Sequence, residues 1–140
     1  MPIRKIITEF PRRYIESGEY MSAFSRISAD LEMLLFDKLF FEKGIKAELM
    51  ERWPLYTFIQ WNLKMGLVDN KWEPLLTDFR KMRNKVIHGR VFLIKLLQNQ
   101  TELNQAKKML YSICEFIDKT EIVYNFNIDI EKEYGRLNRD

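Results

Sequence analysis

Apolar residues recur every three or four positions along most of this sequence, which is the spacing of one face of an α-helix. The widest stripe begins at Tyr20 and runs to Gly44, a residue suited to the left-handed conformation that closes helices. This pattern predicts one long helix of about seven turns. Its apolar positions are Tyr20, Phe24, Ile27, Leu31, Leu34, Leu35 and Leu39.

Shorter stripes of the same period follow, and glycine or proline separates them. Residues 45–52 suggest a short helix. A second long helix is expected to begin at Pro54, because proline lacks the amide hydrogen that an interior position must donate. This helix should end at Gly66, which can again adopt the left-handed closing conformation.

A third helix should follow the next turn, where Asp69 or Asn70 can cap it with a side-chain oxygen, and it should end at Gly89. Residues 91–97 form a mixed run of seven that is apolar except at Lys95, for which periodicity does not separate a helix from a strand; we favour a helix or a loop. A fourth long helix is expected from the stripe over 103–117.

These elements predict an all-α fold, an up-and-down bundle of four to five helices in one domain spanning residues 1–140. Residues 1–18 are expected to form an N-terminal arm, and residues 126–140 a charged tail with helical character. We find no repeat, low-complexity tract or linker that would divide the chain.

Composition agrees with a folded domain, since 46% of the residues are hydrophobic and 14% are aromatic. The longest apolar runs hold four residues, against roughly 20 for a membrane span, and the N-terminal sequence lacks a signal-peptide pattern. The single cysteine, Cys114, sits among apolar residues and is expected to be a buried hydrophobe in a reducing compartment. We therefore expect a cytoplasmic protein with no membrane partner.

The chemically informative segment lies near the end of the third predicted helix. Between residues 80 and 90 it carries five cations and no acid, although the whole chain has a net charge of only +3. Arg80, Asn84 and His88 are successive i, i+4 neighbours, and Arg83 flanks them. The five cations are Arg80, Lys81, Arg83, Lys85 and Arg90.

Arg83 falls where the apolar stripe of this helix would ordinarily place leucine, so its charge requires a partner or a wet cleft. It could pair with a carboxylate such as Asp30 or Glu32, or it could bind a phosphate. His88 is the only histidine in the chain, and a hydrogen bond from Asn84 would fix its ring.

The combination Arg83-Asn84-Lys-Val-Ile-His88 resembles the signature of the HEPN superfamily, the higher eukaryote and prokaryote nucleotide-binding domains. In that family an arginine, commonly followed by a polar residue, precedes a histidine by four to six positions near the end of a late helix. Helix order and the Leu-rich first helix extend the resemblance over residues 20–120.

The resemblance implies a metal-independent ribonuclease of the kind found in toxin–antitoxin, restriction and other defence systems, with an antitoxin or defence-system protein as a further partner. Arg83 and His88 would then be active-site residues, Asn84 a polar support, and the cleft would be shared across a two-fold dimer. One departure is that the HepT toxin branch has a tyrosine two residues after the histidine, where this chain has Arg90. Neutralisation through modification of that tyrosine is therefore not expected.

RNA cleavage by its own 2′-hydroxyl requires a base, an acid and cations for the phosphorane charge. One histidine per chain supplies one proton-transfer group, so a homodimer would supply two. Arg80, Lys81, Lys85 and Arg90 are the candidate contacts to flanking phosphates, with a solvated helix face as their alternative reading. We expect no metal site and no cofactor, since the chain lacks the His/Cys spacing of zinc sites.

Two alternatives to the ribonuclease stay open: a non-catalytic module that binds RNA or a nucleotide, and a helical module that binds another protein. The tryptophans and methionines lie at or beside helix-period positions, so we expect them to pack in the core or on helix faces and not to form base-stacking platforms or a ligand groove. They include Trp53, Trp61, Trp72, Met21, Met33, Met50, Met65, Met82 and Met109.

Overall fold

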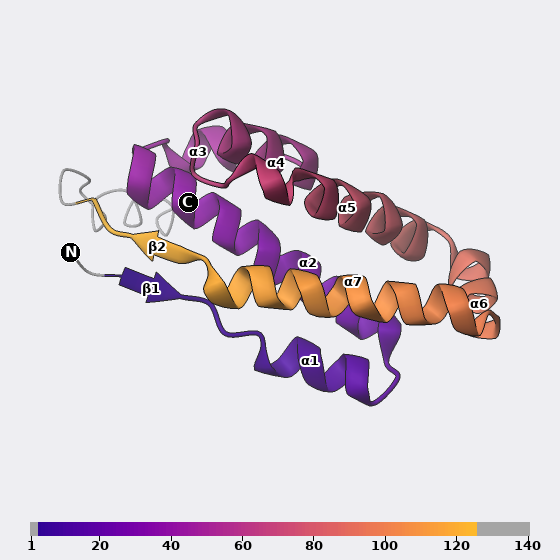
Figure 1. Ribbon diagram of the computed structural model, residues 1–140. Coiled ribbons are helices and arrows are strands. Elements are labelled where there is room, and N and C mark those ends of the chain that lie inside the picture. The colour runs from indigo at the N-terminus through magenta and orange to yellow at the C-terminus, as the bar shows by residue number, and fades with distance from the viewer. Residues whose placement is uncertain (1–2, 126–140) are drawn as a thin grey trace.

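The chain folds as an all-α bundle, as its apolar periodicity predicts (Figure 1). The computed structural model describes residues 3–125. Two three-residue strands flank the helices at one end of the bundle. In chain order the elements are β1 (Ile3–Lys5), α1 (Glu9–Glu16), α2 (Tyr20–Asp37), a π-helical segment (Lys38–Glu42), α3 (Ala47–Met50), α4 (Leu55–Lys64), a 3₁₀ turn (Asn70–Trp72), α5 (Glu73–His88), α6 (Arg90–Gln98), α7 (Gln100–Lys119) and β2 (Glu121–Val123).

Helix α2 is the central element and packs against α1, α4, α5 and α7. Its predicted stripe is the core, and Phe24, Ile27, Leu31, Leu34 and Leu35 are all fully buried. The ring of Phe24 stacks on that of Phe79 in α5, with the ring centroids 6.2 Å apart. Burial of this many large side chains is the main stabilising contribution, at roughly 1.5–3 kcal/mol for each.

The helix ends follow the punctuation of the sequence. Gly44 and Gly66 have positive φ angles of 68° and 71° and close the segments before them. The carboxylate of Asp69 accepts a hydrogen bond from the backbone N–H of Lys71, which opens the turn before α5. The short helix expected at 45–52 is reduced to the single turn α3, and the run at 91–97 is helical.

The N-terminal segment is more ordered than an arm. It contains β1, which pairs antiparallel with β2, and α1, which packs against α2 and α7. The side chain of Asp118 at the end of α7 accepts hydrogen bonds from Thr8 at 2.8 Å and from Arg12 at 2.8 Å. These contacts hold the N-terminal segment against α7, more than 100 residues later in the chain. The charged tail expected at 126–140 lies outside the described residues.

Cys114 is fully buried in α7, in agreement with the interpretation of this residue as a small apolar side chain. Burial raises the pKa of its thiol to about 11, so the reactive thiolate is scarce at neutral pH. Within residues 3–125 no helix combines the length and apolarity that a membrane crossing requires.

Candidate functional site

Helix α5 carries every predicted site residue except Arg90, which is the first residue of α6. One face of α5 is buried in the bundle through Leu76, Phe79 and Val86. Pro74 lies in the first turn of α5, where a backbone amide hydrogen would have no acceptor within the helix, so proline is tolerated. The buried face fixes the rotation of the helix, and this rotation directs Arg83 toward α2 while His88 lies at the exposed carboxyl end.

Arg83 is held by three acceptors at the contact between α5 and α2. Its Nε donates to the hydroxyl of Ser28 at 2.9 Å, and its Nη2 lies 3.2 Å from Oε1 of Glu32. The Arg83 side chain is 22% exposed and that of Glu32 is 38% exposed. Of the two acids that the sequence suggested, Glu32 is therefore the partner, since Asp30 pairs with Arg26 at 3.3 Å.

Asn84 supports Arg83 and not His88. Its Oδ1 accepts a hydrogen bond of 2.8 Å from Nη1 of Arg83. Among the described residues no hydrogen bond joins Asn84 to His88, so the expectation that this amide orients the imidazole is wrong. The physical reason is proximity, because the Arg83 guanidinium lies within hydrogen-bond distance of its neighbour and offers it a charged donor.

His88 is the last residue of α5 and is exposed. Within residues 3–125, its imidazole forms no hydrogen bond or ion pair. The next residue, Gly89, sits between α5 and α6, and a Cβ there would lie 2.9 Å from the backbone carbonyl oxygen of Lys85. Glycine thus permits α6 to begin at Arg90 after a single intervening residue, which leaves the imidazole of His88 at an open helix junction.

The four flanking cations differ in their surroundings. Arg80 stacks its guanidinium over the exposed ring of Tyr56 in α4, at 5.1 Å from the ring centroid. The ammonium of Lys85 lies 5.7 Å from the centroid of Phe92 in α6. Lys81, Lys85 and Arg90 are exposed. Three of the four flanking cations are therefore accessible to an anion.

Sequence reasoning missed Ser28 as a ligand of Arg83. Ser28 is 4% exposed and lies on the flank of the α2 stripe, where a serine also fits a close helix contact. Its neighbour one turn later is Glu32, so the two acceptors share one side of α2. A buried serine four residues before an acid, opposite an arginine in an apolar stripe, is the pattern that could have indicated this cluster.

No group of three or more His, Cys, Asp or Glu side chains in residues 3–125 is arranged to hold a metal ion. Comparison of the chain with models of known protein families, with curated proteins and with solved structures found no match. The functional argument therefore rests on the arrangement of Arg83, Asn84 and His88 and on the charges beside them.

Proposed function

We propose that this chain is a metal-independent endoribonuclease of HEPN type, acting as a homodimer in the cytoplasm, in a defence or toxin–antitoxin setting. The observation that carries the proposal is that one helix, α5, bears both a fixed, partly exposed guanidinium and, at its carboxyl end, an exposed imidazole. Arg83 is oriented by three hydrogen bonds, and His88 is exposed five residues later.

The reaction assigns one proton transfer to each imidazole. One His88 takes the proton of the 2′-hydroxyl as its oxygen forms a bond to phosphorus. The other His88, protonated, donates to the departing 5′-oxygen as its bond to phosphorus breaks. Arg83 stabilises the charge of the phosphorane with a planar pair of donors. The products are a 2′,3′-cyclic phosphate and a 5′-hydroxyl.

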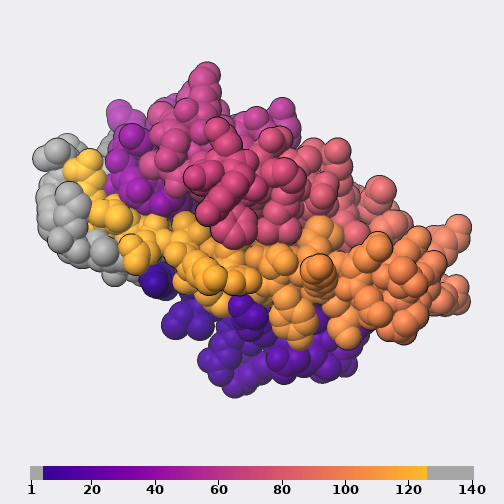
Figure 2. Space-filling view, viewed as in Figure 1, coloured from indigo at the N-terminus to yellow at the C-terminus, as the bar shows by residue number. Residues whose placement is uncertain are grey.

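A second copy is needed because each chain has one histidine. Apolar side chains near the motif support a contact between copies. Ile87 is exposed one turn after Arg83, and α6 exposes Val91, Ile94 and Leu97 at three-residue spacing. Figure 2 shows α6 at one tip of the molecule, projecting beyond the bundle. Exposed apolar side chains grouped in this way are typical of protein interfaces.

Glu32 has a defined place in this mechanism. Its carboxylate meets one edge of the Arg83 guanidinium at the long distance of 3.2 Å. A phosphate oxygen would compete for the same edge, while Ser28 and Asn84 keep the remaining donors in place. We therefore propose that Glu32 occupies this edge of the Arg83 guanidinium until a phosphate of the RNA displaces it.

One observation favours a different function. The contacts of Arg83 to Ser28 and Glu32 join α5 to α2, as an arginine with a purely structural role would. In that case the motif orders a helical module that binds another protein. The two functions differ in their need for His88. Its side chain forms no hydrogen bond or ion pair within residues 3–125, so a purely structural motif would make this residue dispensable.

The test is incubation of labelled single-stranded RNA with the protein in a chelator, followed by mapping of the product ends. We expect 2′,3′-cyclic phosphate ends from the wild-type protein and a loss of about 10²–10⁴-fold in rate for His88→Ala. Lys43→Ala is the matched control, because Lys43 is equally exposed and far from the motif along the chain. Cleavage that persists in His88→Ala, or no cleavage by the wild-type protein, would reject the nuclease.

A further inference from the structure

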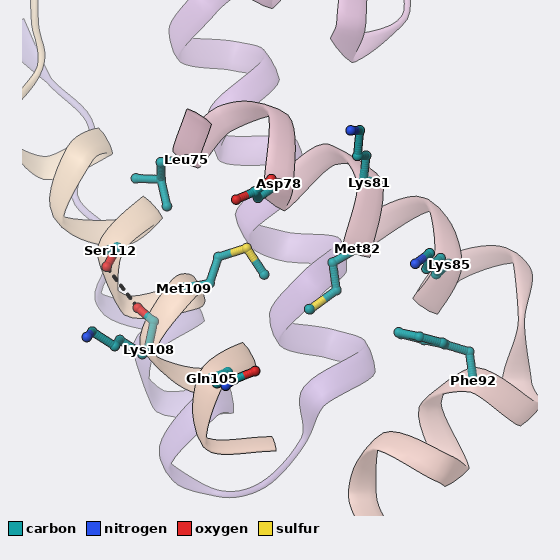
Figure 3. A pocket seen from close by; sticks show the side chains of 10 residues that line it. All are labelled: Leu75, Asp78, Lys81, Met82, Lys85, Phe92, Gln105, Lys108, Met109 and Ser112. Atoms are coloured by element: carbon teal, nitrogen blue, oxygen red, sulfur yellow. Dashed lines mark hydrogen bonds between the residues drawn. The ribbon is translucent and has the colours of Figure 1, made fainter. Parts of the chain in front are cut away.

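A groove of about 540 Å³ lies not at Arg83, but on the opposite flank of α5. It lies between α5, α6 and α7, and Figure 3 shows its lining. In this view Met82 of α5 and Met109 of α7 extend toward each other, and the ring of Phe92 reaches from α6 toward α5. Sequence reasoning treated both methionines as packing residues, yet each contributes to this open surface.

The groove combines an apolar floor with a cationic rim. Met82, Met109 and Phe92 are half-buried and form the floor with Leu75. Around them stand three exposed lysines, against one exposed acid, Asp78. Such a surface suits a ligand with a flat apolar body and attached negative charge. The three lysines are Lys81, Lys85 and Lys108.

The groove is also continuous with the motif. Lys81 and Lys85 are i, i+4 neighbours on α5, and His88 is three residues beyond Lys85. The three side chains therefore form a row along the helix that is about 10 Å long, at 1.5 Å for each residue. A phosphate backbone that followed this row would bring a neighbouring nucleotide to the groove when its reacting phosphate is at His88.

We propose that this groove, between Met82, Met109 and Phe92, is a nucleobase subsite for a nucleotide adjacent to the bond that is cleaved. The base packs against the ring and the thioethers, and Lys81, Lys85 and Lys108 bind its phosphates. Asp78 and Gln105 face the same space and present an acceptor and an amide to the edge of the base. The subsite rests on the proposed ribonuclease for its biological meaning, but nucleotide binding is measurable without cleavage.

The experiment follows the methionine methyl groups of the intact protein by NMR while nucleoside monophosphates are added. We expect the Met82 and Met109 signals, assigned from Met82→Leu and Met109→Leu, to shift with at least one of the four nucleotides. The signals of Met21 and Met65, which lie outside the groove, should stay in place. Inorganic phosphate should move the groove signals much less than a nucleotide does.

The matched variants are Lys81→Ala/Lys108→Ala and Lys43→Ala/Lys46→Ala, which each remove two exposed charges. The first pair should weaken nucleotide binding by about tenfold, since two lysines that bind the phosphates are lost, and the second by less than about twofold. Absence of groove shifts with every nucleotide would overturn the subsite. Equal shifts with inorganic phosphate, or shifts with an acidic amphipathic peptide and not with nucleotides, would also overturn it.

This outcome is separable from the fate of the nuclease. If the methyl groups respond to nucleotides while RNA is not cleaved, the subsite stands and the catalytic proposal fails. If His88-dependent cleavage occurs and no nucleotide perturbs Met82 or Met109, the nuclease stands and the subsite fails.

Discussion

Two arginine–carboxylate clusters, one at each side of the bundle, show how the same chemistry can serve different ends. At the N-terminal side Arg12 lies 2.8 Å from Asp118, and Thr8 donates to the same carboxylate from both its hydroxyl and its backbone N–H. At the motif Arg83 lies 3.2 Å from Glu32. Each hydrogen bond to Asp118 is shorter than the contact between Arg83 and Glu32, whereas the two carboxylates are similarly exposed, at 32% and 38%.

The pKa of Asp118 adds to this contrast. Burial alone would raise the pKa of Asp118, but hydrogen bonds from Arg12 and Thr8 outweigh it and hold that pKa below its usual range. The Arg12 cluster therefore stabilises a charged carboxylate and joins α1 to α7. The Arg83 cluster instead orients the guanidinium of a side chain that is 22% exposed. We interpret the first cluster as a structural tie, and under the proposed function the second is a binding site.

Exchange of each arginine for alanine should separate these roles, and this comparison carries the largest expected effect. Arg83→Ala should lower the rate of RNA cleavage by about 10²–10³-fold, the loss typical of a donor that stabilises transition-state charge. Arg12→Ala should lower the melting temperature and leave the cleavage rate of the folded protein unchanged. If Arg12→Ala inactivates the folded enzyme while Arg83→Ala does not, the two roles are reversed.

Stability against pH should identify the Asp118 cluster. Because the folded pKa of Asp118 is below its ordinary value of 3.8, its stabilisation is complete above that value and is lost as the pH falls through the folded pKa. Asp118→Asn should lower the free energy of unfolding at pH 7 by about 1–3 kcal/mol. The difference from wild type should shrink in acid, as measured by urea denaturation over a pH series.

The control for this measurement is Glu9→Gln, which breaks the exposed pair between Arg13 and Glu9. An exposed pair of this kind contributes about 0–1 kcal/mol, so its loss should be small. An equal effect of Glu9→Gln and Asp118→Asn would show that Asp118 is an ordinary surface carboxylate.

A smaller effect is expected from Glu32→Gln, which keeps the shape of the side chain and removes its charge. RNA binding should tighten by about threefold to tenfold, because the phosphate no longer competes with a carboxylate for Arg83. The measurement is the dissociation constant of a 2′-O-methyl RNA at fixed salt. Weaker binding by Glu32→Gln would mean that the carboxylate orients Arg83 instead of occupying it.

Much of the bundle could be predicted from the sequence because its decisive signals are local. The stripe of α2, the closing glycines at 44 and 66 and the extent of α5 all follow from the period of apolar residues and from backbone preferences. The sequence also pointed to two candidate partners for Arg83, Asp30 and Glu32, because only a few charged residues lie on the buried side of α2.

What could not be predicted depends on contacts between distant residues. Helix α1 has a short buried face of only Pro11 and Ile15, and it is positioned by Asp118, more than 100 residues away. The pairing of β1 with β2 joins the two ends of the described chain. The groove at Met82 and Met109 likewise needs three helices to exist, so periodicity on one helix could not distinguish it from core packing.

The central claim is that two copies of His88 act in one cleft, and mixing of subunits tests it most directly. Wild-type protein is exchanged with an equal amount of His88→Ala protein, and RNA cleavage is measured in chelator. A shared site predicts about one quarter of the activity of wild-type protein at the same total concentration, because statistical pairing leaves a quarter of the dimers with both imidazoles. Retention of half the activity, in proportion to the wild-type chains, would contradict the shared site.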